Sequence, residues 1–376
     1  MVGLSYEEIR RILRKIEFDK TEPKLLTGLI DKAIRLGERE RRRISKMRER
    51  IGQLSDFLQE NGIILELKPD ANLLDQLKKS AVGALDGSYQ VISGSGGQWF
   101  GFFGFSRVLA KDGFCVNPEI TIEALIEPFR CADESEAKII CTEIMMRGES
   151  KTLRYLGEEL RGHEKSYILI DGPIIDPPLY KDPDYISFRA STIKFCINGG
   201  ISVIGFVKRI VGSGFIKFLK STFEERLDLS PFFNDADLLS GLLYMTFSRL
   251  RCQVYTKPVN LFEFLDKNDP MYTVYSLYSQ YGFNIYHSYY KPALRSRVYR
   301  IELASASKLT DDELKSRIKE VLSLICYVWT LPGMNEPLPI LLAHEKCNIR
   351  QGAAEKLYYE IITRSLTEEE AHLWLS

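Results

Sequence analysis

The sequence predicts a mixed α/β fold in which a β-sheet is covered by helices. Apolar runs of strand length fill most of residues 81–126, whereas helical patterns and short strands alternate from residue 133 onward. Strands followed by interleaved helices are typical of such a sheet. Hydrophobic residues make up 45% of the 376 residues, which is ordinary for a protein with a large core.

The chain before residue 80 is expected to be a helical arm. Ser5-Tyr6-Glu7-Glu8 is a capping box, which predicts a short first helix. From Leu26 to Leu58, apolar residues recur at alternating steps of four and three, interrupted only at Gly37 and Glu40. This heptad pattern predicts a long helix that packs on a partner helix, in this chain or in another copy.

The outer face of that helix is strongly basic. A solvated helix face is the interpretation we favour, and a surface that follows nucleic-acid phosphates is the alternative. The residues concerned are Arg39, Arg41, Arg42, Arg43, Lys46, Arg48 and Arg50.

The remaining elements follow from periodicity and turn residues. A first core strand is expected over 81–92, with a hairpin partner over 98–110 across the glycine turn at 93–97. Further strands are expected over 119–126, 166–170, 199–207, 252–258, 283–290 and 296–303. Helices are expected over 133–160, 214–226, from 235, over 310–329 and through most of 336–366. We see no internal repeat, so the simplest division is an arm over 1–79 and one domain over 80–376.

Composition narrows the functional classes. Lys+Arg and Asp+Glu both number 51, so nucleic-acid binding would need local patches. The seven cysteines form no C-x-x-C pair, which favours neither a zinc site nor a disulfide framework and suggests a reducing cytoplasm. The sequence shows neither a secretory leader nor a long apolar run, so neither secretion nor a membrane span is expected. The glycines at 94–97 lack the lysine of a phosphate-binding loop.

Two aspartates lie in or directly after apolar strands, where burying a carboxylate costs free energy. Asp86 lies inside the first predicted strand, and Asp171 directly follows the strand over 166–170; glycine comes after each. A turn would explain either Asp-Gly alone. Because burying an unpaired carboxylate is unfavourable, the pair favours two acids that share a cation.

The helix over 133–160 offers a third acid. At 100° per residue, Glu149 falls in the middle of the arc formed by Met145, Leu153, Leu156 and Leu160. A carboxylate on the face that packs on the sheet extends to solvent, pairs with a buried Lys or Arg, or joins the two aspartates. Glu143 is the second choice on the same helix.

Carboxylate ligands favour Mg²⁺ or Mn²⁺ and suit phosphoryl chemistry. Lys208, at the end of the strand over 199–207, is either a phosphate contact or a solvated lysine. His344, on a predicted helix, is either a packed residue or an acid–base or phosphate contact.

The ordered set of motifs resembles the NurA nucleases, archaeal and bacterial DNA-end-processing enzymes with an RNase H-like core. The residues that carry the resemblance are Asp86-Gly87-Ser88, an acid on the long helix, Ile168-Leu169-Ile170-Asp171-Gly172-Pro173, Val203-Ile204-Gly205-Phe206-Val207-Lys208-Arg209, Asp235-Ala236-Asp237-Leu238-Leu239 and Pro339-Ile340-Leu341-Leu342-Ala343-His344. They span roughly residues 80 to 350.

The resemblance implies a Mn²⁺-dependent nuclease with 5′-to-3′ exonuclease activity on DNA and endonuclease activity on single strands. It also implies a homodimer that docks on a hexameric HerA-type DNA translocase and resects double-strand breaks. Asp86, Glu149 and Asp171 would be the metal ligands, His344 part of the late active-site motif, and Lys208 a substrate contact.

Two other functions fit the sequence. Actin-like ATPases and sugar kinases share the RNase H-like core and would make the chain a nucleotide-binding phosphotransferase. Alternatively, the chain is a non-catalytic adaptor that binds DNA or a motor through its helical arm.

Overall fold

The computed structural model describes residues 23–113, 117–175 and 182–365, so the predicted capping-box helix after Ser5 lies outside the described residues. The chain divides into two compact units, Met1–Gln53 and Leu54–Ser376. Helix α2 (Pro23–Glu60) has 38 residues, which confirms the long helix. It ends at Glu60, shortly before Gly62, which adopts a φ of 67°. Its heptad pairing and the role of its basic face stay predictions.

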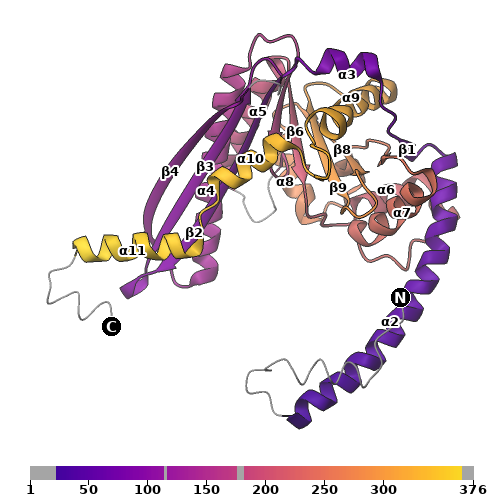
Figure 1. The fold of residues 1–376 in the computed structure, drawn as a ribbon, viewed down its shortest axis with the longest axis horizontal. Helices are drawn as coiled ribbons and strands as arrows, with labels where there is room; N and C mark the ends of the chain where they lie inside the picture. The colour runs from indigo at the N-terminus through magenta and orange to yellow at the C-terminus, as the bar shows by residue number, and fades with distance from the viewer. Residues whose placement is uncertain (1–22, 114–116, 176–181, 366–376) are drawn as a thin grey trace. The chain divides into compact units, whose positions relative to one another are not determined.

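The second unit is built on one sheet of nine strands with the order β1-β7-β8-β9-β6-β5-β2-β3-β4 (Figure 1). The strands are β1 (Ile64–Glu66), β2 (Ala81–Ser93), β3 (Gln98–Ala110), β4 (Glu119–Arg130), β5 (Ser166–Ile170), β6 (Ile201–Val207), β7 (Val254–Thr256), β8 (Asn284–Lys291) and β9 (Tyr299–Ser305).

One end of this sheet, from β6 to the edge strand β4, has the RNase H-like arrangement. Strands β2, β3 and β4 form an antiparallel meander, and β5 and β6 run parallel to β2 on its other side. Taken in chain order from β2 to β6, their spatial order is third, second, first, fourth, fifth. The predicted fold class is therefore confirmed. Strands β9, β8, β7 and β1 extend the sheet with antiparallel pairs.

Helices cover both faces of the sheet. The helices are α3 (Ala71–Leu77), α4 (Glu134–Glu159), α5 (Pro183–Asn198), α6 (Gly214–Phe223), α7 (Asp235–Leu250), α8 (Pro270–Ser279), α9 (Asp311–Ser323), α10 (Leu338–Cys347) and α11 (Gln351–Ser365). Short turns lie at Ser95–Gly97, Glu224–Arg226 and Leu261–Phe264, and a π-helical turn at Leu324–Val328 extends α9.

The two faces carry separate cores because side chains alternate along each strand. On β2, Val82 and Ala84 join α9 and α10 in one core, while Ala81 and Leu85 join α4 and α5 in the other. Burying both faces explains why β5 and β6 read as continuous apolar runs.

Most predicted elements occur at the expected places. Strand β4 runs four residues further than predicted, to Arg130, whereas β7 is shorter than the predicted 252–258. Helix α5 was not predicted, although Ile186, Ala190 and Ile193 are buried at helical spacing, since polar residues share that buried face. Its start was readable, since Asp182 caps the helix and Pro183 occupies its first position.

None of the described helices combines the length and the apolar character that crossing a membrane requires.

Candidate active site

The pairing of β2 with β5 brings the two aspartates together. Leu85 lies opposite Ile170 in this parallel pair, so the next residues, Asp86 and Asp171, emerge side by side. The backbone amide of Asp171 continues the ladder by donating to the carbonyl of Leu85 at 3.2 Å. Both side chains are nearly buried, each with 8% of its surface exposed. The acid inside the predicted strand and the acid at the strand end are thus neighbours.

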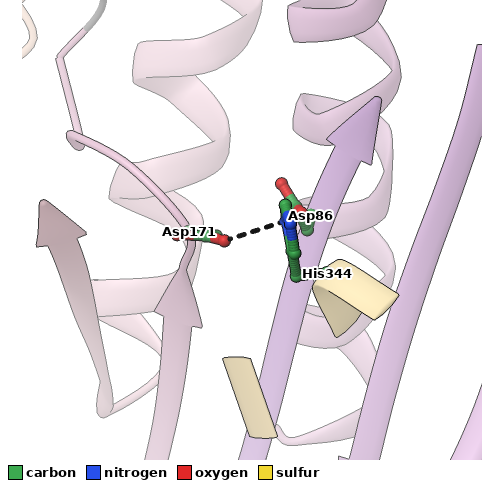
Figure 2. Close-up of side chains that lie close together, drawn as sticks. All are labelled: Asp86, Asp171 and His344. Carbon is green, nitrogen blue, oxygen red and sulfur yellow. Dashed lines mark hydrogen bonds and ion pairs between the residues drawn. The ribbon is translucent and has the colours of Figure 1, made fainter. Parts of the chain in front are cut away.

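Helix α10 adds a histidine to this pair. The Nδ1 atom of His344 lies 2.7 Å from Oδ2 of Asp86 and 3.5 Å from Oδ2 of Asp171. Figure 2 shows Asp171 pointing toward His344 and Asp86, which overlap in this view. One ligand atom from each of the three residues lies within 4.8 Å of the others.

The backbone of α10 is held directly against the sheet. Ser88 on β2 donates a hydrogen bond to the carbonyl of Cys347, and Ser106 on β3 donates to the carbonyl of Ala343 at 2.5 Å. At Gly104, a side chain would collide with the carbonyl of Cys347. These contacts fix the turn of α10 that carries His344.

The buried acids repel each other and lose hydration. Burial raises the pKa of Asp171 to about 6, the charge of Asp86 adds to the rise, and Lys208 and His344 oppose it. Burial also raises the pKa of Asp86, against hydrogen bonds from His344, Cys347 and the Gly87 amide. Two carboxylates in such a place favour a cation between them.

Lys208 follows β6 and supplies one positive charge. Its Nζ lies 2.8 Å from Oδ2 of Asp171 and 3.1 Å from Oε2 of Glu336, in the segment before α10. Burial acts to lower the pKa of Lys208, but Asp171 and Glu336 together raise it above its ordinary value. Lys208 therefore stays charged beside the acids, at the strand exit where the sequence placed it.

Glu149 lies beside Gly87, the residue after Asp86, and is outside the group of three. A Cβ atom on Gly87 would be 2.9 Å from Oε1 of Glu149 and 3.0 Å from Cγ of Met145. The glycine after Asp86 is therefore required by the approach of α4. Glu143, the second choice for the helix acid, forms an ion pair with Arg147 at 2.9 Å instead.

The donor set fits a divalent cation. It consists of two carboxylates and one imidazole nitrogen, and the thiol of Cys347 is not part of it although its Sγ lies 3.4 Å from Asp86 Oδ2. Carboxylate ligands suit Mg²⁺ and Mn²⁺, and the imidazole makes the set less typical of Mg²⁺.

Sequence reasoning missed two acids near the site. Glu336 stands in a loop with no periodic pattern, so nothing in the sequence singled it out. Glu302 lies in the middle of β9 with 2% exposure, and its Oε2 accepts a hydrogen bond from the Ile174 amide at 2.7 Å. A carboxylate inside a strand was the signal that identified Asp86, and it was available at Glu302 as well.

The sheet order and its helices define an RNase H-like α/β protein. A family model described as the NurA domain matches residues 80–349. The match covers more than half of the chain, so the chain belongs to the NurA family and carries its nuclease domain.

One solved structure agrees with this assignment at the level of the fold, and a second shows a weaker similarity. The NurA nuclease from Sulfolobus solfataricus is 12% identical with a TM-score of 0.55, over 92% of this chain and 97% of that one. A structure of NurA with manganese is 13% identical with a TM-score of 0.43, over 88% and 99% of the two chains. No curated protein sequence matches the chain.

Proposed function

We propose that this chain is a metal-dependent DNA nuclease that hydrolyses phosphodiester bonds at the site formed by Asp86, Asp171 and His344. The observation that carries the proposal is the convergence of these three side chains, with ligand atoms within 4.8 Å of one another. They come from two strands and a helix that are far apart in sequence, and membership of the NurA family supports the same chemistry.

The proposed cofactor is Mn²⁺, with Mg²⁺ as the alternative. Asp86 and Asp171 provide the carboxylate ligands and His344 a nitrogen ligand, with Glu149 retained as the carboxylate that α4 contributes from its place beside Gly87. When bound, the ion supplies an activated water and neutralises charge on the phosphate. The two carboxylates lose their mutual repulsion in that state.

Lys208 is the proposed substrate contact. Its ammonium group lies at the edge of the acid cluster, where a phosphate oxygen is a natural replacement for one of its carboxylate partners. His344 is 54% exposed on its side chain, so one side of the imidazole faces the position that a substrate would take.

The finer activities rest on the family. We propose 5′-to-3′ exonuclease action on DNA, endonuclease action on single strands, and a role in resecting double-strand breaks, which places the protein in the cytoplasm with the DNA. The proposed partners are DNA, a second copy of the chain and a hexameric HerA-type translocase. The absence of a phosphate-binding-loop motif from the sequence is consistent with a separate motor.

The test is cleavage of end-labelled single- and double-stranded DNA with Mn²⁺, Mg²⁺ or EDTA. We expect cleavage by the wild type with Mn²⁺, none with EDTA, and a loss on the order of 10²–10³-fold or more in Asp86→Asn and Asp171→Asn, because these changes remove metal ligands worth several kcal/mol. Asp75→Asn, on the exposed surface of α3, is the control. Full cleavage by both site variants would refute the proposal, and tight ATP binding without DNA cleavage would favour the phosphotransferase.

A further inference from the structure

Phe233 is exposed to an unusual degree. Among the large apolar side chains of the described residues, it is the most exposed, at 89%, and Val211 follows at 71%. The adjacent Phe232 is buried, with 6% exposed. A phenylalanine ring gains free energy from leaving water, so a ring presented to solvent next to a buried one calls for a ligand.

The backbone around Phe233 is fixed. Asn234 caps α7 by accepting the Asp237 amide at 2.9 Å, and the amide of Phe233 itself donates to Asp237 at 3.3 Å. The Phe232 amide donates to the carbonyl of Leu229 at 3.2 Å. These bonds fix the backbone of Phe233 at the start of α7, where its ring is exposed.

Phe233 and Val211 lie on two loops that are tied together. The Asp235 amide donates to the carbonyl of Gly212 at 2.9 Å. The buried carboxylate of Asp235 also accepts the amides of Phe215 and Ile216, at 2.9 and 3.0 Å, at the start of α6. The backbone segments that carry Phe233 and Val211 are therefore held together through Asp235.

This loop pair leads directly from the candidate active site. Lys208 contacts Asp171, and Gly212 comes four residues later in the chain. The Cα atoms of Lys208 and Gly212 are therefore at most about 14 Å apart. Exposed Arg209 lies between them. The carboxylates of Asp228, Asp235 and Asp237 accept hydrogen bonds from neighbouring backbone or hydroxyl groups, which holds the loop in place. Arg209 supplies the positive charge of this segment, between Lys208 and Val211.

We propose that Phe233, supported by Val211, is a stacking platform for an unpaired base of the DNA strand whose scissile phosphate lies at Asp86 and Asp171. The proposal rests on the nuclease function above. An aromatic ring binds the π-face of any base, which is accessible in a single strand or a frayed end and hidden inside a duplex. The platform would hold the strand a few nucleotides from the site of cleavage, while Arg209 contacts the intervening phosphates.

The test compares the first cleavage of single-stranded oligonucleotides by full-length wild type, Phe233→Ala and Phe233→Trp with Mn²⁺. The strands are longer than the roughly 4–16 nucleotides of a single-strand-binding module, and one abasic nucleotide is moved along them. For wild type, we expect KM to rise by roughly 5- to 150-fold at one or two adjacent abasic positions, with kcat little changed.

With Phe233→Ala, we expect the raised KM already on the intact strand. An abasic nucleotide at the sensitive positions should raise KM no further, because the ring and the base form a single contact. Phe233→Trp should behave like the wild type. Tyr359→Ala, which removes another exposed aromatic on α11, is the matched control. A wild-type KM for Phe233→Ala, or unchanged sensitivity to the abasic nucleotide, overturns the stacking platform and leaves the ring as a protein-docking surface. A wild type that cleaves no DNA with either metal overturns the nuclease function as well.

Discussion

Glu302 holds the backbone of Ile174, three residues after Asp171. Its Oε2 accepts the Ile174 amide at 2.7 Å, and its Oε1 accepts a hydrogen bond from Arg300 at 2.7 Å. Gly205 on β6 makes room for this contact, since a Cβ atom there would lie 2.9 Å from the carbonyl of Gly172. Glu302 therefore anchors the segment that carries Asp171 through Ile174 and not through Asp171 itself.

Glu302→Gln should weaken Mn²⁺-dependent cleavage while the protein stays folded. The amide keeps the shape of the carboxylate and still accepts a hydrogen bond, but it loses the charge that pairs with Arg300. Groups that position metal ligands typically contribute about 10- to 100-fold in metal affinity or activity. We expect a shift of that size in the Mn²⁺ concentration for half-maximal cleavage, measured by titration.

Glu320→Gln is the matched control, because Glu320 accepts a hydrogen bond from Tyr167 on β5 and does not contact the segment after Asp171. Equal Mn²⁺ dependence of Glu302→Gln and the control would show that Glu302 does not position Asp171.

Gly87→Ala should destabilise the protein and reduce cleavage. The new methyl group would meet Oε1 of Glu149 at 2.9 Å and Cγ of Met145 at 3.0 Å, so α4 or its side chains must shift. Overpacking of this kind costs roughly 1–3 kcal/mol. The free energy of unfolding, from urea denaturation, measures the loss.

The double variant Gly87→Ala/Glu149→Ala separates this clash from other effects. Removing the Glu149 side chain frees space, so the double variant should lose less stability than the sum of the two single changes. Gly352→Ala, where no atom lies within 4 Å of the new group, should be neutral or slightly stabilising. Additive losses would mean that Glu149 does not limit the space at Gly87.

The sequence was informative where a charged residue interrupts an apolar pattern. Asp86 and Asp171 stand out in or after apolar strands, and their proximity follows from the parallel pairing of β2 and β5. The position of His344 beside the aspartates depends on how α10 packs on β3. Gly104 and Ser106 set this packing, and they form no periodic pattern in the sequence. The contact between Lys208 and Glu336 also joins residues that are distant in sequence, so no local pattern predicts it.

The sequence was less informative about elements with mixed faces. Helix α5 buries Tyr185 and Arg189 beside its apolar residues, so its apolar stripe is diluted by polar side chains. The ligand role of Glu149 stays a prediction, because the helical-face argument gives its direction toward the sheet and not its distance from the two aspartates. Side-chain reach of this kind depends on packing that no spacing rule contains.

His287 should make stability depend on pH below neutrality. Burial lowers the pKa of His287 well below its ordinary value, and the charge of Arg300 lowers it further, so the ring is neutral in the folded protein. The unfolded chain binds a proton on this ring below a pH of about 6.5. Protons therefore favour unfolding, and this contribution to stability is present at neutral pH and is lost as the pH falls, by up to about 1.4 kcal/mol per pH unit.

Urea denaturation at several pH values between about 7.5 and 5 should show a steeper fall in the free energy of unfolding for the wild type than for His287→Gln, which has no titrating ring. The comparison cancels the acids near the active site, which both proteins share, and parallel curves for the two proteins would mean that His287 does not contribute.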